Sequence, residues 1–160
     1  MNSQLEHSSE YHNRAEKYEF ATEKWSRVAP YPFFEDISLA PVVSYDAGFI
    51  VFGGYVRDKG QLTETDLIAM FKNEKWLELG SLYQQKRGHG VIIRDNTFWV
   101  VGGTAKATVR QETTSETCSY DQQSIQCQPG NLQLSSAYSF YPEMFLIDVD
   151  MCSHFFISLQ

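Results

Sequence analysis

The stretch GFIVFGG at residues 48–54 decides the fold of this chain, because it recurs as TFWVVGG at residues 97–103. In both copies a β-branched and aromatic run, typical of a strand, leads into two glycines. The pairs Gly53-Gly54 and Gly102-Gly103 lie 49 residues apart. Glycine admits positive φ and close backbone approach, so we expect each pair where a strand ends against a neighbouring sheet.

A tryptophan marker repeats with nearly the same spacing. Trp76 follows Trp25 after 51 residues, and the same step leads on to Cys127. The residues seven positions before these three are Tyr18, Ala69 and Tyr120. A period of about fifty residues is typical of repeat proteins such as solenoids and propellers.

Each repeat is predicted to consist of short strands. VVSYD (42–46) and GVIIRD (90–95) precede the two glycine stretches, and Asp, Asn or Gly bounds each run. Such runs joined by short turns indicate antiparallel meanders. No long window shows the helical period that would compete with this interpretation.

These ordered markers resemble the kelch repeat, in which a strand ending in Gly-Gly precedes a tyrosine, a tryptophan and then an Arg-Gly segment. The closest stretches are AEKYEFATEKW (15–25) and KRGHGVIIRDNTFWVVGG (86–103), the latter containing Arg87. The resemblance implies an all-β fold of kelch-type β-propeller blades, each a four-stranded antiparallel meander. It implies an incomplete propeller, with two full blades and a partial blade at each end.

The resemblance also divides the chain. We expect a polar N-terminal segment at 1–14, the outer strands of a partial blade at 15–28, complete blades at 41–79 and 88–128, and a partial, divergent blade at 135–160. Ser38 occupies the place of Arg87, and the last segment has no glycine pair. Propellers close with about four to eight blades. The missing blades are therefore expected from a longer parent chain or from a second copy.

Composition excludes several partners. The chain has 160 residues, 42% of them apolar, which is enough for one domain with a core. A net charge of -7 disfavours binding to nucleic acid or to an anionic membrane. No run approaches the roughly twenty apolar residues that a membrane helix needs, so no membrane insertion is expected.

The cysteines leave the compartment open. A hairpin that places Tyr120 opposite Ile125 also places Cys118 opposite Cys127, near disulfide reach. A disulfide would indicate an oxidising, extracellular compartment, whereas two reduced thiols would suit the cytoplasm, and the two alternatives weigh equally. Cys152 has no obvious partner. Three cysteines without a C-x-x-C pair predict no metal site.

No catalytic residues and no cofactor are predicted. The chain lacks the phosphate-binding loop, the zinc-binding His-Glu-x-x-His helix and the Gly-x-Ser-x-Gly elbow. His89 lies within the RGHG segment of the repeat, which favours a structural role, and the other histidines (His7, His12 and His154) are scattered.

A binding face is predicted from the meander. Alternate turns emerge on the same side, and these are the segments 29–38, 55–65, 80–87 and 104–114. They carry cations beside apolar anchors, a mixture suited to an acidic peptide: Arg57, Lys59, Lys106, Arg110, Phe33, Phe34 and Tyr83. The alternative is ordinary surface charge with aromatic rings packed between blades.

Three functions remain in competition. The kelch resemblance implies a non-catalytic protein–protein interaction module that binds a protein or peptide partner. A second interpretation is an extracellular or receptor ectodomain module that carries the hairpin disulfide. A third is a fragment of a propeller enzyme, such as an oxidase or an epimerase, whose chemistry would need blades that this chain lacks.

Overall fold

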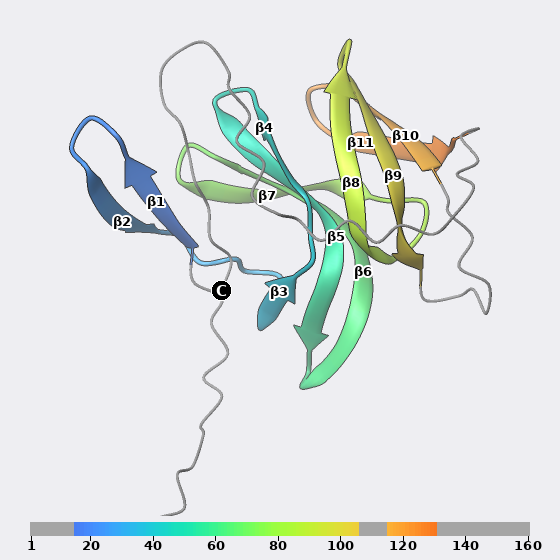
Figure 1. Ribbon diagram of the computed structural model, residues 1–160, viewed down its shortest axis with the longest axis horizontal. Coiled ribbons are helices and arrows are strands. Elements are labelled where there is room, and N and C mark those ends of the chain that lie inside the picture. The colour runs from blue at the N-terminus through green and yellow to red at the C-terminus, as the bar shows by residue number, and fades with distance from the viewer. Residues whose placement is uncertain (1–14, 106–114, 131–160) are drawn as a thin grey trace, which may run out of the picture.

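The computed structural model describes residues 15–105 and 115–130, and these form strands and turns (Figure 1). The expected segments 1–14 and 135–160 lie outside the described residues. Within the described ranges there is no helix that could span a membrane. The strands are β1 (Ala15–Glu19), β2 (Lys24–Val28), β3 (Asp36–Ser38), β4 (Val42–Tyr45), β5 (Gly48–Asp58), β6 (Gln61–Lys72), β7 (Lys75–Ser81), β8 (Lys86–Arg94), β9 (Thr97–Ala105), β10 (Ser115–Tyr120) and β11 (Ile125–Pro129).

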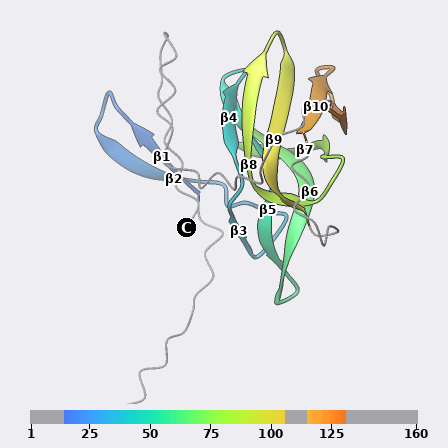
Figure 2. The same cartoon turned by 45° about the vertical axis from the view of Figure 1, so that its right-hand side comes forward.

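Strands β4 to β7 form one antiparallel meander, here called the first blade, and β8 to β11 form the second blade. The first meander runs from residue 42 to 81 and the second from 86 to 129, beside the predicted bounds of 41–79 and 88–128. The two meanders also join at one point, where β7 and β11 pair in parallel between Gly80 and Ile125. Figure 2 shows the β1–β2 hairpin on the left, apart from both blades, and β10 of the second blade on the right.

The N-terminal hairpin, β1 with β2, is a two-stranded sheet of its own. Tyr18 is the cross-strand neighbour of Trp25, and their ring centroids lie 5.2 Å apart. In the described part of the chain the hairpin pairs with no other strand, so the assignment of residues 15–28 to the outer half of a blade stays a prediction. Trp25 is 55% exposed, so it adds little to the core.

The inner strand of the first blade is broken in two. Ser38 on β3 pairs with Tyr55 on β5, and 49 residues later Arg87 on β8 pairs with Thr104 on β9. Strands β3 and β4 of the first blade together correspond to the single strand β8 of the second blade. Pro41 lies between the halves, and proline has no N–H to donate to a strand ladder. The prediction that residues 29–38 form a loop is therefore wrong for the last three.

The glycine pairs lie within strands and not at strand ends, contrary to prediction. Strand β5 runs through Gly53-Gly54 to Asp58, with a shift of register between Phe52 and Gly54. Gly53 has a φ of +51°, and a β-carbon there would lie 2.8 Å from Leu82 Cδ1 and 2.9 Å from the Lys86 carbonyl oxygen. Because Gly53 has no β-carbon, the backbone of β5 can lie directly against Leu82 and Lys86, on the chain that leads from the first blade into the second.

Two apolar clusters cover the two faces of the first blade. Side chains alternate along a strand, so Ile50 and Phe52 face the second blade while Phe49 and Val51 face the N-terminal side. Each fully buried apolar side chain of this size contributes about 1.5–3 kcal/mol. The cluster between the blades contains Val43, Ile50, Phe52, Ile68, Met70, Leu79, Leu82, Phe98, Val100, Cys118 and Ile125.

Trp76 closes the cluster on the N-terminal side. Its ring centroid lies 4.9 Å from that of Tyr31 and 5.4 Å from that of Phe49, both in edge-on geometry. Its indole Nε1 donates a hydrogen bond of 2.9 Å to the carbonyl oxygen of Ala29. The repeat tryptophan thereby ties the chain that leaves the N-terminal hairpin to the first blade.

Candidate functional site

The predicted binding face is more regular than expected. Strands β5 and β6 extend through most of residues 55–65 and leave only Lys59 and Gly60 as the turn between them. The link between the blades shortens to residues 82–85. Figure 1 shows the β5–β6 tip, β3 and the end of β9 on the lower side, opposite the β4–β5 and β8–β9 turns. We call the β5–β6 tip, residues 29–35 and residues 82–85 the loop face.

Two of the four predicted cations lie in the described part of the chain. Lys59 is exposed at the tip of the β5–β6 hairpin. Arg57 is half-buried, and its Nη1 donates a hydrogen bond of 3.3 Å to the Gly60 carbonyl oxygen. The cross-strand neighbour of Arg57 on β3 is Asp36, a residue of opposite charge. Lys106 and Arg110 lie outside the described residues.

Phe33 and Phe34 do not project as free anchors. Both are partly buried against the N-terminal cluster, with ring centroids 5.3 and 6.3 Å from that of Tyr31. Tyr31 is itself buried, and this burial raises the pKa of its hydroxyl. The two phenylalanines therefore pack against Tyr31 and the apolar cluster on this face of the first blade and do not project as anchors.

Tyr83 remains exposed while its backbone is fixed. The side chain is 60% exposed on the link between the blades. The backbone N–H of Tyr83 donates a hydrogen bond of 2.7 Å to Glu116 Oε2. An aromatic ring is thus presented to solvent from an anchored backbone, the arrangement expected of a binding anchor.

Arg87 belongs to a cluster that the sequence did not predict. Its guanidinium carbon lies 4.2 Å above the ring of Tyr55, and its Nε lies 3.6 Å from Glu64 Oε1. Tyr55 and Glu64 are themselves cross-strand neighbours on β5 and β6. The first residues of the second blade are thereby held against the first blade by a cation–π contact and an ion pair.

Glu116, which accepts the hydrogen bond from the Tyr83 backbone, also belongs to a buried ion pair. Lys86 Nζ lies 2.6 Å from Glu116 Oε1, and both side chains are only 1% exposed. Lysine and glutamate are almost never fully buried unless they are paired. The sequence offered no signal for this contact, because 30 residues separate the partners and both types are ordinary surface residues.

His89 is the second buried polar group near the link. Burial, and next the charge of Lys86, lower the pKa of its imidazole to about 3. The folded protein therefore keeps this histidine neutral at physiological pH. His89 lies on β8 and is 3% exposed, and the structural role expected for the RGHG segment stays a prediction.

Cys118 and Cys127 face each other across the β10–β11 hairpin, in the register expected from the opposition of Tyr120 and Ile125. The structure joins them by a disulfide bond. The Tyr120 hydroxyl donates to the Gln122 carbonyl oxygen at 3.1 Å within the same hairpin. The disulfide and this bond hold the outer edge of the second blade, where the tryptophan of the other repeats is missing.

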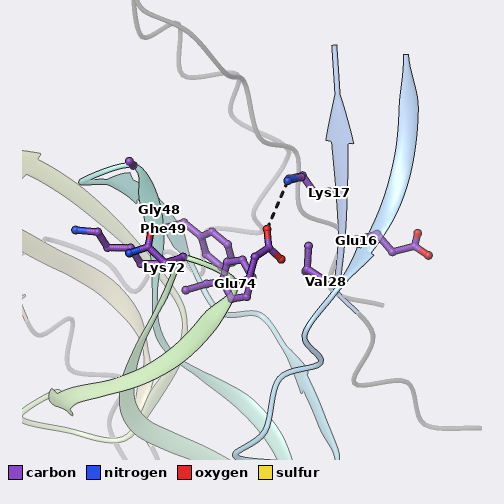
Figure 3. Close-up of a pocket in the computed structure, with 10 residues that line it drawn as sticks. Glu16, Lys17, Val28, Gly48, Phe49, Lys72 and Glu74 are labelled. Carbon is purple, nitrogen blue, oxygen red and sulfur yellow. Dashed lines mark ion pairs between the residues drawn. The ribbon is translucent and has the colours of Figure 1, made fainter. Parts of the chain in front are cut away.

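A cavity of about 190 Å³ lies between the N-terminal hairpin and the turns of the first blade (Figure 3). Val28, Phe49 and Phe71 supply its apolar lining. Lys17 of β1 reaches Glu74 of the β6–β7 turn across it, with 3.5 Å between Nζ and Oε1. The charges in this cavity are therefore partly neutralised by pairing, and it brings together none of the predicted binding residues.

The chain matches no protein-family model and no curated protein. It is similar to a solved structure described as "Structure of YjhT", with a TM-score of 0.54 and 20% sequence identity. The match covers 66% of this chain and 34% of the other, so the chain spans about a third of that protein's length. At this identity the similarity shows the fold alone. Together with the two meanders, it shows that the chain is all-β and adopts an incomplete β-propeller-like fold.

Proposed function

We propose that this chain is a non-catalytic interaction module built from kelch-type blades, which binds a protein or peptide partner through the loop face. The observation that carries the proposal is Tyr83, whose ring is 60% exposed although Glu116 holds its backbone in place. A preordered aromatic anchor loses little conformational entropy when a partner covers it, and aromatic residues dominate binding hot spots.

The charges of the loop face favour an acidic partner segment. Lys59 is exposed in a chain whose net charge is -7. Arg57 and Arg87 stand nearby on β5 and β8, although each already contacts the protein. Lys59 is flanked by the exposed Asp58, so it offers an acidic peptide one local contact, which supports specificity more than affinity.

The kelch assignment rests on the equivalence of the repeats. Arg87 and Ser38 occupy the same register position against β9 and β5, and the glycine pairs have positive φ in both blades. Within residues 15–105 and 115–130, two four-stranded blades and an outer hairpin do not close a ring. We therefore infer that additional blades, from the same parent chain or from a second copy, complete the propeller in use.

A peptide-binding measurement tests the proposal. The probe is a short fluorescein-labelled peptide rich in glutamate with a single phenylalanine, followed by fluorescence anisotropy. Tyr83→Ala is expected to weaken binding at least about tenfold, since truncation of a hot-spot residue costs about 2 kcal/mol or more and about 1.4 kcal/mol corresponds to a factor of ten. Lys59→Glu is expected to weaken binding and to reduce its dependence on salt.

Lys75→Glu is the matched control, because Lys75 is also an exposed lysine but begins β7 at the opposite turns of the first blade. It makes the same change of charge as Lys59→Glu and should leave binding unchanged. Equal affinity of the wild type and Tyr83→Ala, or equal losses for the two lysine variants, would overturn the proposed face.

The disulfide favours a second form of the same proposal, an extracellular or receptor ectodomain module. A bond between Cys118 and Cys127 persists in oxidising compartments and is rare in the cytosol. Intact mass after thiol alkylation, on protein from its native source that has never met a reductant, separates the two. Alkylation of Cys152 alone would support the extracellular form, whereas alkylation of all three cysteines would leave a cytoplasmic module.

A further inference from the structure

Glu116, Cys118 and Cys127 form a compact cluster of metal-ligating groups. Glu116 and Cys118 are two residues apart on β10 and so project from the same face of the strand. Cys127 is the cross-strand neighbour of Cys118 on β11. The carboxylate oxygen and the two sulfur atoms all lie within 4.8 Å of one another.

Two of the three groups are buried, and the third is partly accessible to solvent. Glu116 and Cys118 are 1% exposed, whereas Cys127 is half-buried on the last strand of the second blade. The sulfur atoms of a tetrahedral zinc site lie about 3.8 Å apart, because each Zn–S bond is about 2.3 Å. Once the disulfide is opened, Cys127 can move outward by the small distance that this separation requires.

The charges around the cluster also suit a divalent ion. Lys86 contributes one positive charge beside Glu116. Two thiolates, one carboxylate, one ammonium and one Zn²⁺ sum to zero net charge. A neutral sum matters in a buried place, since an uncompensated charge there is costly.

We propose that reduction of the Cys118–Cys127 disulfide converts this edge of the second blade into a zinc site with Glu116, Cys118 and Cys127 as ligands and one position open to water. Thiolate sulfur selects zinc over magnesium and calcium, which prefer oxygen ligands. The site is thus closed to metal under oxidising conditions and available under reducing ones. The site shares Glu116 with the proposed loop face, because Glu116 Oε2 accepts the hydrogen bond from the Tyr83 N–H. Cobalt bands report on the metal site and peptide anisotropy reports on the face, so the failure of one is distinguishable from the failure of the other.

The site forms in two reactions, reduction of the disulfide and then binding of the metal ion. A phosphine reductant breaks the S–S bond and takes an oxygen atom from water to become its oxide, and the two protons of that water end on the two sulfurs. Binding of Zn²⁺ then forms two Zn–S bonds and one Zn–O bond. The two thiol protons pass to the solvent, so two protons are released for each ion bound.

The experiment uses Co²⁺ as a spectroscopic probe on the full chain, with Zn²⁺ as competitor. The phosphine-reduced protein is expected to bind one Co²⁺, with thiolate-to-cobalt bands in the near ultraviolet and tetrahedral bands in the visible. Zn²⁺ should displace it and release two protons per ion into a weak buffer. The unreduced protein should show no such bands.

Variants assign the ligands. Cys127→Ser should abolish the bands, and Glu116→Gln should weaken zinc binding by at least about 100-fold, the upper range for loss of even an outer-shell partner. Cys152→Ser is the matched control and should bind as the wild type does. If Glu116→Gln does not fold, Cys127→Ser and the proton count decide.

Three results would overturn the proposal: no cobalt bands in the folded, reduced wild type, bands that survive Cys127→Ser, or unchanged affinity in a folded Glu116→Gln protein. Circular dichroism provides the folding control. If reduction unfolds the chain, recovery of the strand signal on adding Zn²⁺ supports the site, and failure to recover counts against it.

Discussion

The backbone N–H of Gly88 donates a hydrogen bond of 2.9 Å to the carbonyl oxygen of Leu39, and these two residues occupy the same position in successive repeats. Their φ angles, +62° and +52°, are nearly equal. Adjacent blades are thus joined beside their inner strands by a bond between equivalent residues. The placement of one blade beside the next is therefore fixed at a position that both repeats share.

Replacing Gly53 with alanine tests the contact between the blades. A β-carbon there would lie within 3.0 Å of Leu82 Cδ1, the Lys86 carbonyl oxygen and the Thr65 carbonyl oxygen. We expect Gly53→Ala to lower the free energy of unfolding by about 2–4 kcal/mol, from backbone strain and overpacking together. Urea unfolding followed by circular dichroism measures the change.

Gly60→Ala separates the two contributions. Gly60 has a φ of +77°, but nothing lies within 4 Å of an added β-carbon. This variant should lose only about 1–2 kcal/mol, the cost of a left-handed backbone for a residue with a side chain. Equal losses at Gly53 and Gly60 would mean that the steric contact with the link contributes nothing.

The hydrogen bond from Trp76 to Ala29 is expected to stabilise the fold measurably. Trp76→Phe keeps an aromatic ring but removes the Nε1 donor, so the Ala29 carbonyl oxygen loses a partner. We expect a loss of about 1–3 kcal/mol in urea unfolding. Trp25→Phe, at a tryptophan that is 55% exposed, should change stability by less than about 0.5 kcal/mol. Similar losses for both variants would contradict the assigned role.

Two ion pairs of equal length should differ in their response to mutation. Lys86–Glu116 and Lys72–Asp46 both have an N–O distance of 2.6 Å, but only the first is buried. Lys86→Met leaves a buried carboxylate without its cation and should cost about 3–5 kcal/mol. Lys72→Met should cost at most about 1 kcal/mol. The Lys86→Met protein unfolding at the same urea concentration as Lys72→Met would refute the burial argument.

His89 predicts a loss of stability in mild acid. Its pKa in the folded protein, about 3, is below the ordinary value near 6.5, so as the pH falls the unfolded chain binds the proton first. Its contribution is therefore complete above about pH 6.5 and declines as the pH falls toward 3, by up to about 1.4 kcal/mol per pH unit. Between about pH 7.5 and pH 5 the loss attributable to His89 should be about 2 kcal/mol.

His89→Gln isolates that contribution. The variant has no imidazole to titrate, so its urea midpoint should change less between the same two pH values than that of the wild type. The comparison is between slopes, which removes any constant effect of the substitution on packing. Parallel pH profiles for the two proteins would show that His89 is protonated as easily in the folded state as in the unfolded one.

The sequence predicted the blades because their markers are local. The glycine pairs, the turns and the Tyr18–Trp25 and Cys118–Cys127 oppositions follow from spacing within a hairpin. Strand β3 was missed for a local reason as well, because Pro41 interrupts the inner strand and makes its first half resemble a loop. The lengths of β5 and β6 were underestimated because the stretch RDKGQLTET (57–65) is mostly polar and has the composition of a loop.

The candidate site was predicted less well, because it depends on contacts between distant segments. Phe33 and Phe34 were expected as anchors, but Tyr31 and the first blade cover them. The Lys86–Glu116 pair depends on where β8 and β10 meet, which no spacing along the chain encodes. Tyr83 was predicted as an aromatic residue on a link, whereas its anchored backbone became visible only in the structure.

The bond between Gly88 and Leu39 has a consequence for how such a chain can change in length. Because the two residues share one backbone geometry, cutting the chain at both and rejoining the ends removes one whole repeat and leaves the same conformation at the seam. A loss or duplication of 49 residues at this point keeps the seam compatible. The tryptophan marker repeats after 51 residues, so the turns away from the seam accept small differences in length while the seam itself keeps its position in the repeat.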